Sequence, residues 1–202
     1  MKKLVVLFAA MMVMTGVAVA DGPAWTYVDL GFTVGDSDDN EFSDGDTDGI
    51  SLDGSWGKGL WHVGGSYGQM GFQDLDADVI KLMVGINPEI TENTDMYVDV
   101  FYNNWDDSDQ GFEADRTGIR WGIRSMITDS FELNGGMSYT DFDIDGNSDS
   151  STDVGFNFGL QYFFNNSSGI GFTFDRFDFV DTDDYGTVDM ARVYYRYSFG
   201  QK

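Results

Sequence analysis

The sequence contains no cysteine, two prolines and one histidine in 202 residues. Without cysteine the chain has no disulfide framework, no thiolate metal site and no cysteine nucleophile. Basic residues are scarce as well: 11 Lys and Arg stand against 35 Asp and Glu, which gives a formal net charge of −24. Because so acidic a chain repels phosphate groups, we expect no nucleic-acid partner.

Long hydrophobic runs are also missing, except at the N-terminus. There, two lysines precede the largely apolar run Leu4–Val19, and Ala18–Ala20 forms a small-x-small cleavage site. This arrangement predicts a cleavable signal peptide over residues 1–20, which directs export through the Sec route. Residues 21–202 are then expected to form one domain. The run is shorter than the roughly 20 apolar residues of a membrane-spanning helix, so any crossing of a membrane must use strands.

The chain is instead rich in glycine, with 26 residues, and in aromatic residues, which make up 16%. The most regular stretch, Val188–Phe199, alternates an apolar face ending in aromatics with a face that carries two arginines. A two-residue period indicates a β-strand. The same period predicts ten strands, within the segments Thr26–Thr33, Ile50–Trp56, Trp61–Gly68, Val79–Ile86, Met96–Tyr102, Thr117–Arg124, Phe131–Thr140, Val154–Tyr162, Ile170–Asp175 and Val188–Phe199.

The connections between these strands alternate in kind. Those after the second, sixth and eighth strands are short turns. Those after the odd-numbered strands are predicted to be long acidic loops, at residues 36–49, 71–78, 103–115, 141–153 and 178–187. Short turns on one side and long loops on the other are typical of outer-membrane barrels. The connection Asn87–Asp95 is longer than this layout prefers.

Charged residues on the polar strand faces distinguish a barrel from the alternative, a secreted β-sandwich. A hydrophobic core does not accept unpaired charge, whereas a barrel lumen lets charges pair. The residues of this predicted lumenal charge network are Asp29, Asp53, Lys81, Asp99, Arg120, Arg124, Glu132, Asp175, Arg192 and Arg196. Because about eight strands leave room only for side chains, ten enclose little space. We therefore favour a lumen plugged by ion pairs, with a narrow porin-like channel for small solutes or ions as the alternative.

The predicted fold class is all-β: a transmembrane, antiparallel, up-and-down β-barrel of about ten strands. The whole mature chain resembles, in pattern, the small outer-membrane β-barrels of Gram-negative bacteria, the OmpA-like and porin-like group. The resemblance implies contact with outer-membrane lipid and lipopolysaccharide, and a monomer. It also implies a signal for the barrel-assembly machinery in the last strand, matched here by Tyr195, Tyr197 and Phe199. The extension Gly200–Lys202 departs from the terminal aromatic residue usual in that group.

Catalysis is not expected. The only histidine, His62, begins the third predicted strand at the short-turn end. Omptin-like proteases, which this chain is similar to in strand number, place an Asp–His pair at the outer rim, the other end of the barrel. A surface hydrolase would also need His62 beside a nucleophile. We expect a structural or surface-interacting barrel, with a hydrolase as the least favoured alternative.

Two acidic segments raise the question of a metal. Oxygen ligands two residues apart suit calcium, and the candidates are Asp44, Asp46, Asp48, Asp143, Asp145 and Asp149. The bidentate glutamate of an EF-hand is missing, since Ser55 and Val154 occupy its position. Solvated loops are therefore favoured, with weak Ca²⁺ or Mg²⁺ binding as the alternative and no other cofactor expected. The outer leaflet beside these loops is anionic and repels them unless salt screens the charges or divalent cations bridge them. A saline habitat would fit this requirement.

Overall fold

The computed structural model describes residues 23–38, 45–72, 75–107, 112–144, 151–178 and 187–199, so the predicted signal peptide lies outside the described residues. The strands are β1 (Tyr27–Asp38), β2 (Gly45–Lys58), β3 (Trp61–Phe72), β4 (Leu75–Ile86), β5 (Glu89–Thr91), β6 (Thr94–Asp107), β7 (Phe112–Thr128), β8 (Phe131–Ile144), β9 (Ser151–Phe163), β10 (Ser168–Asp178) and β11 (Thr187–Ser198). In the described part of the chain, no helix is long and apolar enough to cross a membrane.

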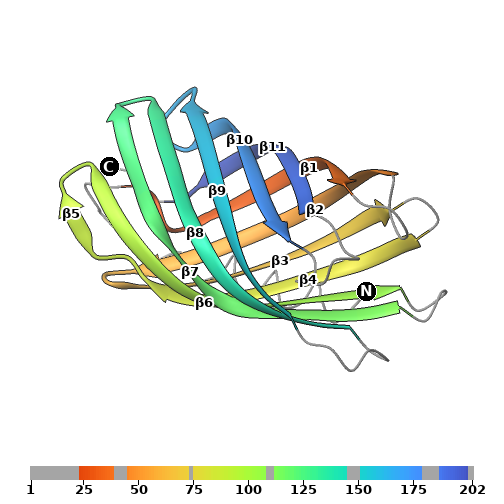
Figure 1. The fold of residues 1–202 in the computed structure, drawn as a ribbon. Helices are drawn as coiled ribbons and strands as arrows, with labels where there is room; N and C mark the ends of the chain where they lie inside the picture. The colour runs from red at the N-terminus through yellow and green to blue at the C-terminus, as the bar shows by residue number, and fades with distance from the viewer. Residues whose placement is uncertain are drawn as a thin grey trace.

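These strands form one closed antiparallel barrel (Figure 1). Each barrel strand pairs with its neighbours in sequence, and pairing of β4 with β6 and of β1 with β11 completes the ring. The short strand β5 pairs only with β6 and lies at one end of the barrel, in the segment predicted as an unusually long connection. Ten strands therefore build the wall, and the prediction of an antiparallel barrel of about ten strands is confirmed.

The first and last strands close the barrel in continuous register. Tyr27 lies opposite Ser198, and the pairing continues to Asp38 opposite Thr187. Beyond the ladder, the Phe199 amide donates to the carbonyl of Thr26 at 2.8 Å. Both ends of the barrel chain thus meet at the end that carries the β2–β3, β7–β8 and β9–β10 turns, hereafter the short-turn end.

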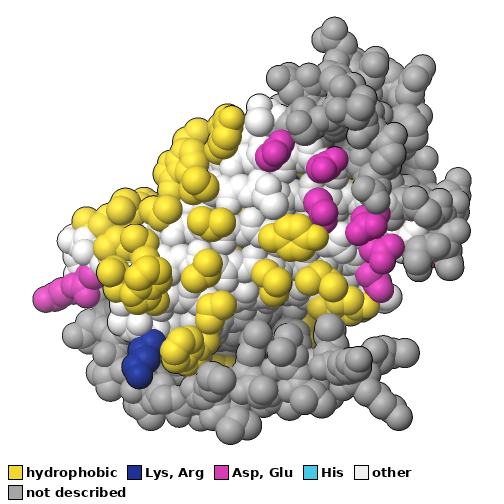
Figure 2. All heavy atoms as spheres, turned by 90° about the horizontal axis from the view of Figure 1, so that it is seen from below, with side chains coloured by type: hydrophobic (Ala, Val, Ile, Leu, Met, Phe, Trp, Pro, Cys, Tyr) yellow, Lys and Arg dark blue, Asp and Glu magenta, His cyan; other side chains and the backbone are white. Residues whose placement is uncertain are grey.

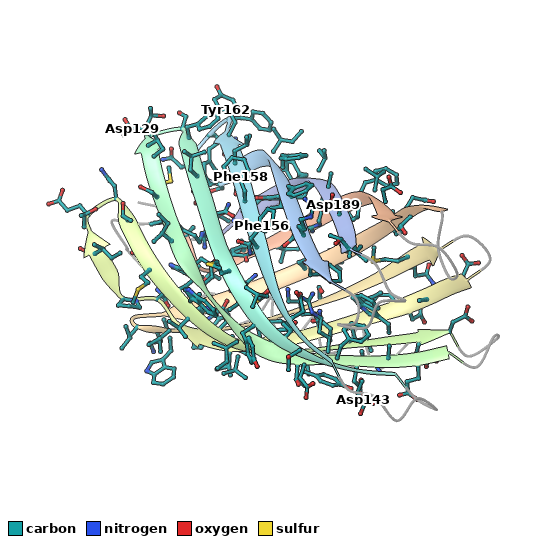
Figure 3. The ribbon with its side chains drawn as sticks, in the orientation of Figure 1. Asp129, Asp143, Phe156, Phe158, Tyr162 and Asp189 are labelled. Atoms are coloured by element: carbon teal, nitrogen blue, oxygen red, sulfur yellow. The ribbon has the colours of Figure 1, made fainter. Side chains whose placement is uncertain are left out.

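Strand alternation sorts the side chains into an apolar outer face and a polar inner face. Leu30, Val100 and Val154 are more than half exposed. Figure 2 shows hydrophobic side chains spread over the outer wall, with most of the visible acidic side chains toward one edge. Figure 3 shows Phe156, Phe158 and Tyr162 projecting from the wall. The most deeply buried side chains are mainly polar: His62, Gln161, Glu132, Thr140, Asp29, Asp99, Pro23 and Ser198. This inverts the order of a water-soluble domain and suits a wall surrounded by lipid.

The strands continue far into the segments predicted as acidic loops, so those loop boundaries were wrong. β3 ends at Phe72 and β4 begins at Leu75, and β6 and β7 leave only residues 108–111 between them. The acidic side chains obscure the strand period because they occupy outward positions where lipid-facing residues are expected. Two of them are hydrogen-bonded there. Asp78 accepts from Tyr67 Oη at 3.0 Å, and Asp115 accepts from Tyr102 Oη at 2.6 Å and from Asn104 Nδ2 at 3.0 Å.

Candidate functional site

Ion pairs line the inner wall of the barrel. Five of the six arginines of the chain face the lumen, while Arg176 lies on the outer face of β10, and each of the six is paired with a carboxylate. The pairs are Arg196–Asp29, Arg192–Asp53, Arg120–Asp99, Arg124–Glu132, Arg176–Asp189 and Arg116–Asp153. Two are bidentate and buried: Arg196 reaches Asp29 with two contacts of 2.7 Å, and Arg124 reaches Glu132 at 2.9 and 3.0 Å. Planar guanidinium–carboxylate pairing of this kind is the strong form of a salt bridge.

Some of these contacts pass over an intervening strand, and glycine makes this possible. Arg192 on β11 reaches Asp53 on β2 across β1, and its Nε donates to Ser51 Oγ at 3.2 Å. A Cβ on Gly31, the residue of β1 beneath this contact, would collide with the guanidinium. The lumenal glycines are therefore not merely small fillers of the wall. Because they have no side chain, they leave space for a charged side chain to pass over one strand and reach the next.

The same arrangement holds at the only histidine. His62 Nε2 lies 2.7 Å from Asp99 Oδ1, and its Nδ1 lies 3.2 Å from the Asn87 side-chain amide. The contact runs from β3 to β6 over Gly85 of β4, where a Cβ would meet both partners. Asp99 also accepts from Arg120 Nε at 3.0 Å. His62 is thus fully buried and shares a carboxylate with an arginine.

The structure brings together most of the predicted lumenal charges. Asp29, Asp53, Asp99 and Glu132 each meet one of the arginines on the predicted polar faces. Lys81 and Asp175 line the same cavity, yet neither belongs to an ion pair among the described residues. Two pairs, Arg116–Asp153 and Arg176–Asp189, were not predicted, because each includes a residue in a predicted loop or at its border.

Trp25 fills the short-turn end of the lumen. Its indole Nε1 donates to Asp95 at 2.6 Å, its ring stacks on His62 at 4.3 Å, and the Arg124 guanidinium lies 4.4 Å from its centroid. Tyr97 meets it edge-on. Pro23 and Ala24, which precede it, are buried. The segment before β1 thus turns back into the barrel and touches β3, β6 and β7. Trp25 was not among the predicted site residues because it precedes the first alternating strand.

An apolar cluster fills the opposite end. Its buried members are Trp105, Ala114, Phe142, Phe177 and Val188, drawn from five strands. Trp105 contacts Phe142 edge-on at 5.6 Å, and Arg116 lies 4.1 Å above the Phe177 ring. The expectation that ion pairs replace a hydrophobic core inside the barrel is therefore incomplete. Three of the five members, Trp105, Ala114 and Phe142, lie in segments predicted as loops, where no inner face was assigned.

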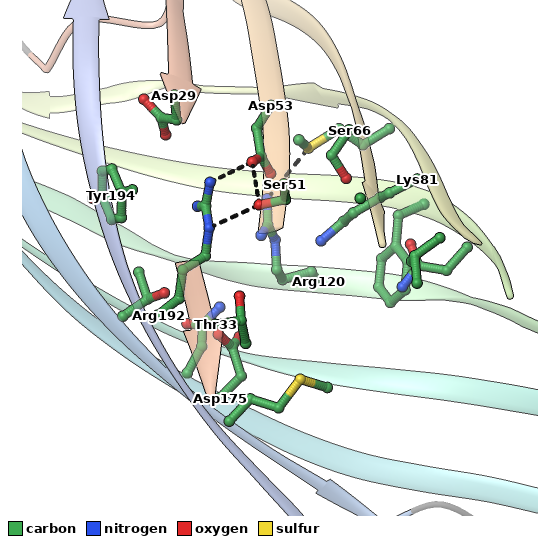
Figure 4. Close-up of a pocket in the computed structure, with 18 of the residues that line it drawn as sticks. Asp29, Thr33, Ser51, Asp53, Ser66, Lys81, Arg120, Asp175, Arg192 and Tyr194 are labelled. Carbon is green, nitrogen blue, oxygen red and sulfur yellow. Dashed lines mark hydrogen bonds and ion pairs between the residues drawn. The ribbon is translucent and has the colours of Figure 1, made fainter. Parts of the chain in front are cut away.

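Between the two ends lies a cavity of about 300 Å³ (Figure 4). Lys81, Arg120, Arg192 and Asp53 line it, together with hydroxyl-bearing side chains such as Ser66. Figure 4 shows these polar groups converging from several strands onto the same space. In order from the short-turn end, the lumen therefore contains the contacts of Trp25, a polar cavity and the apolar cluster around Trp105.

The metal candidates fall largely outside the described residues. Asp44, Asp145 and Asp149 are not described, nor is the side chain of Asp46. The two that remain, Asp48 and Asp143, join no cluster: among the described residues, no group of three or more His, Cys, Asp or Glu is arranged to hold a metal ion. Of the predicted assembly-signal residues, Tyr195 and Tyr197 are 48% and 44% exposed on the outer face of β11, where lipid would contact them.

Comparison by sequence finds no matching family model and no matching curated protein. Comparison by structure finds an outer-membrane channel of Pseudomonas putida F1, which is 10% identical and covers 88% of this chain and 96% of that one with a TM-score of 0.56. Neisserial surface protein A is 15% identical, and the match covers 87% of this chain and 98% of that one with a TM-score of 0.45.

A third structure, the outer membrane protein OmpT of Vibrio cholerae, is 13% identical, with a TM-score of 0.39. The match takes in 75% of this chain and spans 56% of that protein. At these identities the comparisons establish the fold alone. That fold is a closed antiparallel β-barrel of the outer-membrane type.

Proposed function

We propose that this outer-membrane β-barrel is a closed, non-conducting barrel with a structural or surface-interacting role. Its short-turn end faces the periplasm, and its acidic end faces outward. The observation that carries the proposal is the packing of Trp25 at one end of the lumen and of the Trp105 cluster at the other. In this proposal the two groups act as seals. Small solutes would have to displace both seals to pass through.

The wall-bound ion pairs support the same function. A charged side chain inside a barrel is stable when paired and hydrogen-bonded, and costly when its partner is lost. Because each arginine is already paired, an ion in transit finds few free charges to exchange with. A fixed set of salt bridges therefore suits a barrel that holds its shape better than one that conducts.

We also propose that the barrel has no enzymatic activity. His62 lies buried at the short-turn end, held between Trp25 and Asp99. A general base must reach the proton that it abstracts, and this imidazole is 2% exposed. Activity in a protease or esterase panel that disappears in His62→Ala would contradict the assignment.

A narrow channel is the second candidate. The cavity of about 300 Å³ between the seals favours it, as does the similarity in fold to an outer-membrane channel. In this case one seal would act as a gate. The closed barrel is preferred because aromatic side chains occupy both ends of this cavity.

Planar-bilayer conductance of the refolded mature chain separates the two functions. We expect no reproducible open steps from the wild type or from either Trp25→Ala or Trp105→Ala alone, because one seal remains in each. The double variant should conduct. Trp121→Ala is the matched control, since Trp121 lies on the outer face and is 40% exposed. Regular open steps in the wild type would refute the closed barrel.

A further inference from the structure

The cavity between the seals is lined by one cationic and one acidic side chain that belong to none of the ion pairs of the described wall. Lys81 on β4 and Asp175 on β10 both line it, and neither belongs to an ion pair among the described residues. Among the described residues, Asp175 and Asp53 attract Lys81, while Arg120 and Arg116 repel it. The two charges therefore act on each other through the cavity without touching.

This is exceptional in a lumen where every arginine is paired. A charge held away from bulk water is stable when an opposite charge and hydrogen-bond partners surround it. The ring of Phe101, 5.4 Å from Lys81 Nζ, supplies only part of that environment. An occupant of the cavity that carries both charges would complete it, with an anionic group on Lys81 and a cationic group on Asp175.

The rest of the cavity suits a small polar occupant. Hydroxyl groups of Thr33, Ser51 and Ser66 face it, and Figure 4 shows Ser51 and Ser66 beside Lys81 and Arg192. A volume of about 300 Å³ lies at the lower limit of ligand cavities, enough for a small solute but not for a large one. Size, hydrogen-bonding capacity and charge thus point to the same class of molecule.

We propose that the cavity binds a small zwitterionic solute, with the solute's carboxylate on Lys81 and its ammonium group on Asp175. A solute with both charges on one molecule should bind more tightly than two separate ions, because its second contact forms within a complex that already exists. This site is independent of the proposed closed barrel, since binding in detergent micelles does not require the lumen to conduct.

The test measures thermal unfolding of the mature chain in micelles, with the solute present during refolding so that sealed ends do not prevent entry. L-alanine and 4-aminobutyrate are the probes, because they bracket two spacings of the charges. At least one is expected to raise the melting temperature at millimolar concentration. An equimolar mixture of sodium acetate and methylammonium chloride, which carries the same charges on separate molecules, is expected to leave it unchanged.

Variants identify the site. Lys81→Met and Asp175→Asn should each weaken the apparent affinity about tenfold, as expected for the loss of one charge-assisted contact. Lys58→Met, at an exposed position beside the β2–β3 turn, should bind as the wild type does. Three results would overturn the proposal: no shift with either probe, an equal shift with the salt mixture, or equal binding by the Lys81 and Lys58 variants. If the two variants have non-additive effects on stability and neither probe has any effect, Lys81 and Asp175 instead form a direct pair.

Discussion

The salt bridge that closes the barrel offers the sharpest test of the lumenal network. Arg196 on β11 and Asp29 on β1 face each other in register, form two contacts of 2.7 Å and are 8% and 2% exposed at their side chains. The Arg196 guanidinium also lies 3.5 Å from the ring centroid of Tyr27. Asp29→Asn keeps the shape of this carboxylate and removes its charge, so Arg196 stays buried with a neutral partner.

Removing one partner of a buried pair costs about 3–5 kcal/mol of folding free energy, because the remaining charge is uncompensated. The matched control is Arg176–Asp189, at 3.1 Å, with side chains 43% and 37% exposed. Exposed pairs contribute about 0–1 kcal/mol, so Asp189→Asn should have little effect. The structure therefore predicts a several-fold difference in cost between two aspartates that each pair with an arginine, Asp29 inside the barrel and Asp189 on its outer face.

Reversible urea unfolding of the refolded protein in lipid vesicles, followed by tryptophan fluorescence, measures both values. A second variant, Asp29→Asn with Arg196→Met, removes both charges and should recover much of the loss. If Asp29→Asn costs no more than Asp189→Asn, the closing pair does not stabilise the barrel, and burial of the lumenal ion pairs has no bearing on their strength.

Two further predictions concern local geometry and assembly. Gly85→Ala should destabilise the barrel by about 1–3 kcal/mol, because the added methyl collides with the His62–Asp99 contact. Gly135→Ala should cost less than about 1 kcal/mol in the same urea titration, since the nearest atom to its added methyl is 3.5 Å away; equal costs would contradict this view of the lumenal glycines. Phe199→Ala should slow insertion by the barrel-assembly machinery, measured with reconstituted machinery and a heat-modifiability gel, while spontaneous refolding in detergent stays unchanged. Insertion at the wild-type rate would exclude Phe199 from the assembly signal.

The sequence by itself determined the barrel. A period of two is visible wherever lipid-facing apolar residues alternate with lumenal polar ones, as in β11, where Val193, Tyr195 and Tyr197 alternate with Arg192 and Arg196. Charge on the inner face requires partners, so paired arginines could be anticipated before any pair was known. The carboxylate that each arginine meets could not be anticipated. Asp53 and Arg192, for example, lie 139 positions apart and touch across an intervening strand.

Only the tertiary structure decided what fills the two ends of the lumen. Trp25 belongs to no alternating segment, and its place against His62 and Asp95 depends on where the chain turns before β1. Trp105 and Phe142 lie among aspartates that resemble loop composition, although there too every second residue points inward. A strand's period indicates which residues share a face, but closure of the sheet brings those faces together. The contacts of Trp25, the Trp105 cluster and the cavity between them are products of that closure.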